Sequence, residues 1–179
     1  MGAAFYAVQA VLRLRGEETG GRAEAVLTGS VSRMRWAGSH LIYPAVGSAA
    51  LLLVGGVGVG LGAGSVLGDV GGWTGKLVEA ALVQLPAVWV FAAAALALVG
   101  LWPKGAAAAW GVLGVLLLIS YLGPAVDAGQ WLLDLTPFTH VPRLPGGTFS
   151  WAALVVLTVI SAGLTVGGLV GLRRRDILA

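Results

Sequence analysis

The chain has 179 residues, of which 58% are hydrophobic and only 11% are charged, and its net charge is +3. Water-soluble domains are about 25% charged, so this chain has too few polar residues to cover a soluble globule, and an integral membrane protein is the expected class. The absence of cysteine excludes disulfides, thiolate chemistry and any metal site built on cysteine.

The first segment, residues 1–12, is mildly apolar and is interpreted as part of a transmembrane helix or as an interfacial helix. Arg13 and Arg15 follow this stretch instead of preceding it, which is the reverse of the order in a cleavable signal peptide. We therefore do not expect a signal peptide here.

Residues 13–37 predict a cytoplasmic loop that contains an amphipathic helix. The apolar positions of this helix follow the i, i+3, i+4 spacing of a single helix face, and they are Ala23, Val26, Leu27, Ser30, Val31 and Met34. Two interpretations stay open. The helix lies on the inner leaflet with its arginines facing anionic lipid, or it docks on a cytoplasmic partner, which the Glu17-Glu18 pair slightly favours.

Residues 38–179 predict a transmembrane domain with four spans. Four stretches lack Asp, Glu, Lys and Arg over roughly 20 residues, the length that a hydrocarbon core of about 30 Å requires of a helix. They lie at about 41–66, 80–102, 105–123 and 150–172. The expected fold is an all-α membrane protein with four transmembrane helices, a cytoplasmic amphipathic coupling-type helix and a short extracellular helix or loop.

Glycines at four-residue spacing predict close helix packing in two of these spans. They are Gly56, Gly60 and Gly64 in the first span and Gly163, Gly167 and Gly171 in the fourth. A phosphate-binding loop is not supported, because no GxGxxG register and no following Lys-Ser or Lys-Thr is present. Pro86, early in the second span, predicts a kink.

The basic residues predict the orientation. With four spans, nine of the eleven Lys and Arg residues fall on one side, and only Lys76 and Arg143 fall on the other. The positive-inside rule makes the nine-residue side cytoplasmic. Both termini are then inside, and the loops 69–79 and 127–149 are outside. The basic clusters thus indicate membrane orientation and not a nucleic-acid partner.

The outer segment 127–149 is the remaining candidate for chemistry. Residues 130–135 resemble a short surface helix anchored by Trp131, and three prolines then impose a turn-rich path. Asp127 and Asp134 could share a helix face as a carboxylate pair, but nothing else in the loop supports hydrolysis. We predict no catalytic residue, no metal site and no cofactor. The spans also lack a mid-membrane charge, which argues against a self-powered pump.

Four segments together resemble one family. They are 12–27 (LRLRGEETGGRAEAVL), 32–40 (SRMRWAGSH), 136–142 (TPFTHVP) and 171–177 (GLRRRDI). In order and spacing relative to the spans, they resemble actinobacterial type-2 ABC exporter permeases of the polyketide antibiotic exporter kind, and the match corresponds to the C-terminal part of such a permease.

The resemblance implies an ATP-driven exporter for a hydrophobic compound such as a polyketide antibiotic or drug. ATP hydrolysis would occur in a separate ABC ATPase subunit, and Glu17, Glu18, Arg22 and Glu24 would contact that subunit. Compared with the family, the chain lacks the first span and most of the second. We therefore expect further permease spans or a second permease copy as partners in the cell membrane. The alternative function is a non-transporting tetraspan scaffold or accessory subunit.

Overall fold

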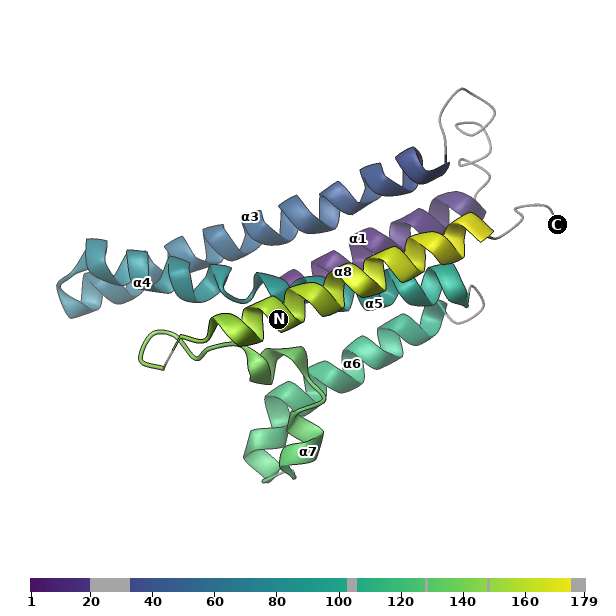
Figure 1. Cartoon of the computed structure of the whole chain (residues 1–179). Coiled ribbons are helices and arrows are strands. Elements are labelled where there is room, and N and C mark those ends of the chain that lie inside the picture. The colour runs from purple at the N-terminus through teal and green to yellow at the C-terminus, as the bar shows by residue number, and fades with distance from the viewer. Residues whose placement is uncertain (20–32, 103–105, 128, 148, 175–179) are drawn as a thin grey trace.

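The computed structural model describes residues 1–19, 33–102, 106–127, 129–147 and 149–174, and every regular element in them is helical (Figure 1). This confirms the all-α class. The elements are α1 (Gly2–Thr19), α3 (Arg33–Leu67), α4 (Val70–Leu82), α5 (Leu85–Leu101), α6 (Ala106–Leu122), η2 (Gly123–Val126), α7 (Gln130–Leu133), η3 (Pro137–His140) and α8 (Trp151–Arg174).

Three helical stretches among these residues are long and apolar enough to cross a membrane: Leu41–Leu67, Val70–Leu101 and Trp151–Arg174. Helix α6 is equally apolar but has 17 residues, about 25 Å of helix. The outer faces of α3 and α8 carry bare aliphatic side chains, such as Val54 (68% exposed) and Val159 (64% exposed). Lipid is the solvent that such surfaces require.

Helix α3 and helix α4 form an antiparallel hairpin. The segment 69–79, which we expected to be a connecting loop, is helical instead. Gly68 adopts a positive φ of 80°, a conformation that glycine reaches without steric cost. Asp69 then caps α4 by accepting a hydrogen bond of 2.9 Å from the Gly72 amide. One tight turn therefore suffices to reverse the chain.

The predicted glycine seam of the first span is confirmed, and its partner is α4. A Cβ atom on Gly56 would lie 2.9 Å from the Val78 Cα, and one on Gly60 would lie 2.5 Å from the Thr74 Cα. Gly64 faces Val70 in the same way. These glycines let the two backbones touch, which is how small residues join helices where lipid removes the usual hydrophobic driving force.

Helix α4 ends at Leu82 and helix α5 begins at Leu85, so the predicted kink near Pro86 is confirmed as a break. Pro86 lies in the first turn of α5, where backbone N–H groups have no acceptor within the helix and a proline therefore costs no hydrogen bond. Most residues of α5 are buried. An alanine-rich helix without a polar face fits the centre of a bundle, and α1, α3, α6 and α8 all contact it (Figure 1).

Helix α8 runs parallel to α5 along the whole length of α5. Ala87 shares a cluster with Leu157 near the start of both helices, and Gly100 meets Gly168 and Gly171 near the end. The seam predicted from Gly163, Gly167 and Gly171 is wrong at its first two positions, because Gly163 and Gly167 face open space. The buried face of α8 instead follows Leu157, Ser161, Gly168, Gly171 and Leu172.

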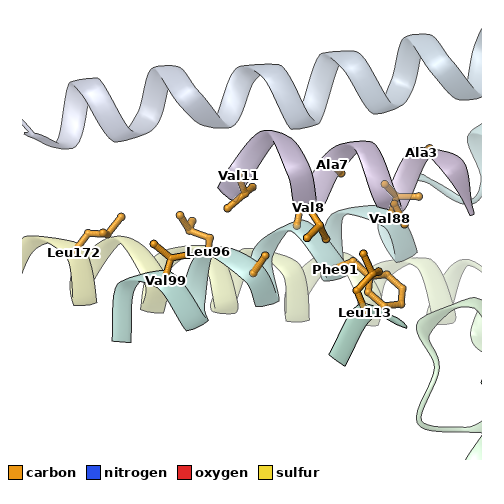
Figure 2. Close-up of a cluster of buried hydrophobic side chains, with 13 residues drawn as sticks. Ala3, Ala7, Val8, Val11, Val88, Phe91, Leu96, Val99, Leu113 and Leu172 are labelled. Atoms are coloured by element: carbon orange, nitrogen blue, oxygen red, sulfur yellow. The ribbon is translucent and has the colours of Figure 1, made fainter. Parts of the chain in front are cut away.

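Helix α1 is longer than the predicted 1–12 segment and lies in the core. Ala4, Ala7, Val8 and Val11 are each at most 2% exposed, and they pack on Val88, Phe91 and Leu96 of α5 (Figure 2). On its other side the Tyr6 hydroxyl donates to the Tyr43 carbonyl of α3 at 3.4 Å. The buried small side chains of α1 favour the transmembrane interpretation of this segment over the interfacial one.

Candidate functional site

One end of the bundle gathers the basic residues. Helix α1 runs parallel to α5 and α8, and α3 runs in the opposite direction, so the ends of α1, α5 and α8 meet the start of α3 (Figure 1). We call this the basic end, and it carries Arg13, Arg15, Arg33, Arg35, Arg173 and Arg174. Asp69 and Lys76 lie on the hairpin at the opposite end. The charge asymmetry that the sequence predicts is therefore also a spatial asymmetry.

The four residues predicted to contact an ATPase are only partly placed by the structure. Glu17 and Glu18 lie in the last turn of α1, at the basic end. Arg22 and Glu24, with the predicted amphipathic helix around them, fall outside the described residues. The loop was expected to begin at Arg13, but α1 continues to Thr19, so Glu17 and Glu18 extend a core helix instead of lying in a separate loop.

The far end holds the outer segment. Its predicted surface helix is confirmed as α7, and Trp131 is 72% exposed. Thr136 is fully buried, and the Thr139 hydroxyl donates to the Leu133 and Thr136 carbonyls at 2.9 and 2.7 Å. Phe138 then stacks on Phe91 of α5, with ring centroids 5.4 Å apart. The segment is thus fixed to the central helix.

The carboxylates of this segment do not form a pair on one helix. Asp127 has a left-handed backbone (φ 47°) and ends η2, while Asp134 follows α7 and accepts a hydrogen bond of 2.8 Å from Gln130. A shared helix face for Asp127 and Asp134 was therefore a wrong expectation. Among the described residues, no group of three or more His, Asp or Glu side chains could hold a metal ion.

The interior is polar at few points. In the described part of the chain the buried polar side chains are Ser48, Thr136 and Ser161, none of them charged. The Trp89 indole N–H donates to the Ser48 hydroxyl at 3.2 Å and links α5 to α3. Sequence reasoning missed this bond, because a lone serine in an apolar run does not reveal its partner. A cavity of about 140 Å³, lined by apolar residues that include Val8, Phe91 and Leu113, lies between α1, α5 and α6.

An apolar exterior, helix seams of small residues and a basic end together define a polytopic α-helical membrane protein. Residues 1–173 match the family described as "Multidrug efflux system permease Rv1217c, C-terminal domain", and the chain belongs to that family. Its sequence is 46% identical, over 177 residues, to the multidrug efflux system permease protein Rv1217c of Mycobacterium tuberculosis (strain ATCC 25618 / H37Rv). That alignment covers 99% of this chain and 32% of the relative, so the chain spans about a third of the relative's length.

The family agrees with the resemblance at the level of a transmembrane efflux permease. The expected membrane location is also supported, because the relative is a permease and the apolar helices need a bilayer.

Proposed function

We propose that the chain is the C-terminal permease part of an ATP-driven ABC exporter that moves hydrophobic compounds out of the cell. The observation that carries this proposal is the match of residues 1–173 to the C-terminal domain of a multidrug efflux permease. The chain has no enzymatic role of its own in this proposal, and a separate ABC ATPase subunit hydrolyses ATP. The polyketide antibiotics suggested by the sequence resemblance are the first cargo to test.

The proposed topology has four spans after α1, with the C-terminus in the cytoplasm. Both termini were expected on that side, but α1 runs parallel to α5, and Met1 lines a pocket with Gln84 and Arg143 at the far end, so only the C-terminus shares the basic end. Helix α3 leads outward, α4–α5 returns, α6 leads outward again and α8 returns. The parallel packing of α5 and α8 supports this order, since both must then cross in the same direction. Helix α6 is the short span, and η2 extends it by one turn. The basic end is the cytoplasmic side under the positive-inside rule.

The proposed contact with the ATPase lies where α1 leaves the bundle. Glu17 and Glu18 occupy the last turn of α1, and Arg22 and Glu24 follow in sequence. Because α1 packs against α5 through Val8 and Val11, a displacement of its end is passed directly to the central helix. Such a helix can bias the bundle between inward-open and outward-open arrangements.

Further spans complete the transport path in this proposal. A four-span piece is too small to enclose a wide pathway, and the outer faces of α3 and α8 remain uncovered and apolar. The missing helices come from other permease segments or from a second permease copy.

Co-purification from the native membrane tests the proposal. The chain should retain an ABC ATPase, and Glu17→Lys with Glu18→Lys should lower the retained amount about tenfold. The matched control is Asp134→Lys, which reverses an exposed carboxylate at the far end and should leave the amount unchanged. If the variant with both Glu17→Lys and Glu18→Lys retains as much ATPase as the wild type, the docking assignment is wrong. If the chain retains no ATPase at all, the result favours the alternative function, a non-transporting scaffold or accessory subunit.

A further inference from the structure

A groove opens where α4 ends and α5 begins. The start of α8 forms its other wall, and its volume is about 570 Å³, within the range of about 300–1,000 Å³ that holds drug-sized ligands. Its lining includes Glu79, Leu82, Pro86, Trp89, Trp151 and Leu154. The groove exists because the helix break before Pro86 separates α4 from α5 beside the first turn of α8.

The groove has one charge and several aromatic rings. Glu79 is the only ionisable residue in its lining, and no ion pair of Glu79 occurs within the described ranges. The nearest cation along α4 is Lys76, which lies over the Trp73 ring, 5.1 Å from its centroid, and does not line the groove. The negative charge of Glu79 therefore meets no positive protein group in the groove.

The aromatic side chains are placed as a wall. Trp89 donates a hydrogen bond to Ser48 of α3, and this bond restricts the orientation of its ring. Trp151 meets Phe149 edge to face, with centroids 4.8 Å apart, and both side chains line the groove. Indole faces attract cations, and a carboxylate beside them adds to that attraction.

We propose that this groove binds lipophilic organic cations, in which one positive charge is surrounded by apolar groups. Charge complementarity selects this occupant. Glu79 would attract the positive charge, and the indoles of Trp89 and Trp151 would contact the cation. The aliphatic residues of the lining would pack against its apolar groups. An anion of the same shape would meet the carboxylate and be rejected. The inference rests on the proposed function, because it assigns a cargo class and a site to that exporter.

Tetraphenylphosphonium binding tests this assignment. The full chain is placed in nanodiscs of zwitterionic lipid, and empty nanodiscs give the background uptake. Glu79→Gln should weaken binding of tetraphenylphosphonium about tenfold. Tetraphenylborate is the anion of nearly the same shape, and it should bind the wild-type groove more weakly than the cation. Glu79→Gln should reduce this difference in affinity between the cation and the anion.

Matched variants separate the groove from general effects. Trp151→Leu should weaken binding of the cation, whereas Trp131→Leu, which removes an equally exposed indole (72% against 73%), should not. Asp134→Asn is the control for loss of a carboxylate. The helical circular dichroism of each variant should match that of the wild type.

The outcomes separate the site from the exporter, because binding requires neither ATP nor transport. The groove assignment is wrong if Glu79→Gln binds tetraphenylphosphonium with wild-type affinity, or if Trp151→Leu and Trp131→Leu weaken this binding equally. Either result counts against the groove even if ATPase-dependent efflux is present. Glu79-dependent binding in a protein without ATPase-dependent efflux supports the groove and contradicts the proposed function.

Discussion

Gly100 of α5 and Gly168 of α8 meet backbone to backbone. A Cβ atom on Gly100 would lie 2.9 Å from the Gly168 carbonyl carbon, and one on Gly168 would lie 2.9 Å from the Ala97 amide nitrogen. Neither position has room for a methyl group. The distance between α5 and α8 is therefore set by the absence of side chains at this crossing.

Valine at position 168 should push α5 and α8 apart. We expect Gly168→Val to lower the free energy of unfolding in detergent by about 1–3 kcal/mol, the usual cost of overpacking a tight core. Thermal or denaturant titration of the purified chain measures it. The neighbouring Gly167→Val is the control, because a Cβ atom at position 167 would have no neighbour within 4 Å. If Gly168→Val and Gly167→Val lower the free energy of unfolding equally, the close contact between α5 and α8 at Gly168 does not determine the stability.

Loss of the Asp69 side chain should fray the start of α4. The carboxylate accepts a hydrogen bond from the Gly72 amide, and removing such a cap costs about 1 kcal/mol. In Asp69→Ala, hydrogen exchange of the amides from Gly71 to Trp73 should therefore accelerate about fivefold. Asp134→Ala should leave these amides unaffected, and unchanged protection in Asp69→Ala would show that the cap does not hold the helix.

Removal of the Ser48 hydroxyl should leave the Trp89 indole N–H without its partner. We expect Ser48→Ala to destabilise the chain by about 0.5–1.5 kcal/mol, since polar contacts between membrane helices are modest in strength. Ser65→Ala is the control, because the Ser65 hydroxyl is exposed and bonds only to the nearby Gly62 carbonyl. A stability change no larger than that of Ser65→Ala would argue against the link between α3 and α5.

Single cysteines should report the orientation, since the chain contains none of its own. A membrane-impermeant maleimide added to intact cells should label Trp131→Cys on the exposed α7. Thr19→Cys, at the end of α1, should be labelled only after the membrane is opened. The reverse pattern would place the basic end outside and contradict the proposed topology.

The composition of the chain was sufficient to predict its fold class, because a chain with 11% charged residues has few alternatives to a helical membrane domain. The Gly56-Gly60-Gly64 seam was predicted correctly, although the identity of its partner was not. The second seam failed because four-residue spacing alone does not decide which face of a helix is covered. In α8 the covered glycines are Gly168 and Gly171, one position and one turn after Gly167, where a Cβ atom would meet no neighbour.

Other features required three-dimensional information. The 69–79 segment contains Lys76 and Glu79, which made it resemble a polar connection, yet backbone contact with the glycines of α3 stabilises it as a helix. The groove beside Glu79 joins residues from α4, α5 and α8, and no local pattern brings Glu79 together with Trp151. The acidic pair Glu17-Glu18 favoured a docking helix only slightly, the resemblance added the ATPase as its partner, and the function of both residues stays a prediction.

Pro44 gives α3 a mechanical consequence. Proline donates no backbone hydrogen bond, so one rung of the helix is missing near its basic end. Bending should be easiest there, and the contacts of Gly56, Gly60 and Gly64 with α4 should make the part of α3 beyond Pro44 move together with α4. A small rotation near Pro44 would therefore displace Leu67, at the other end of α3, much farther than the residues beside Pro44.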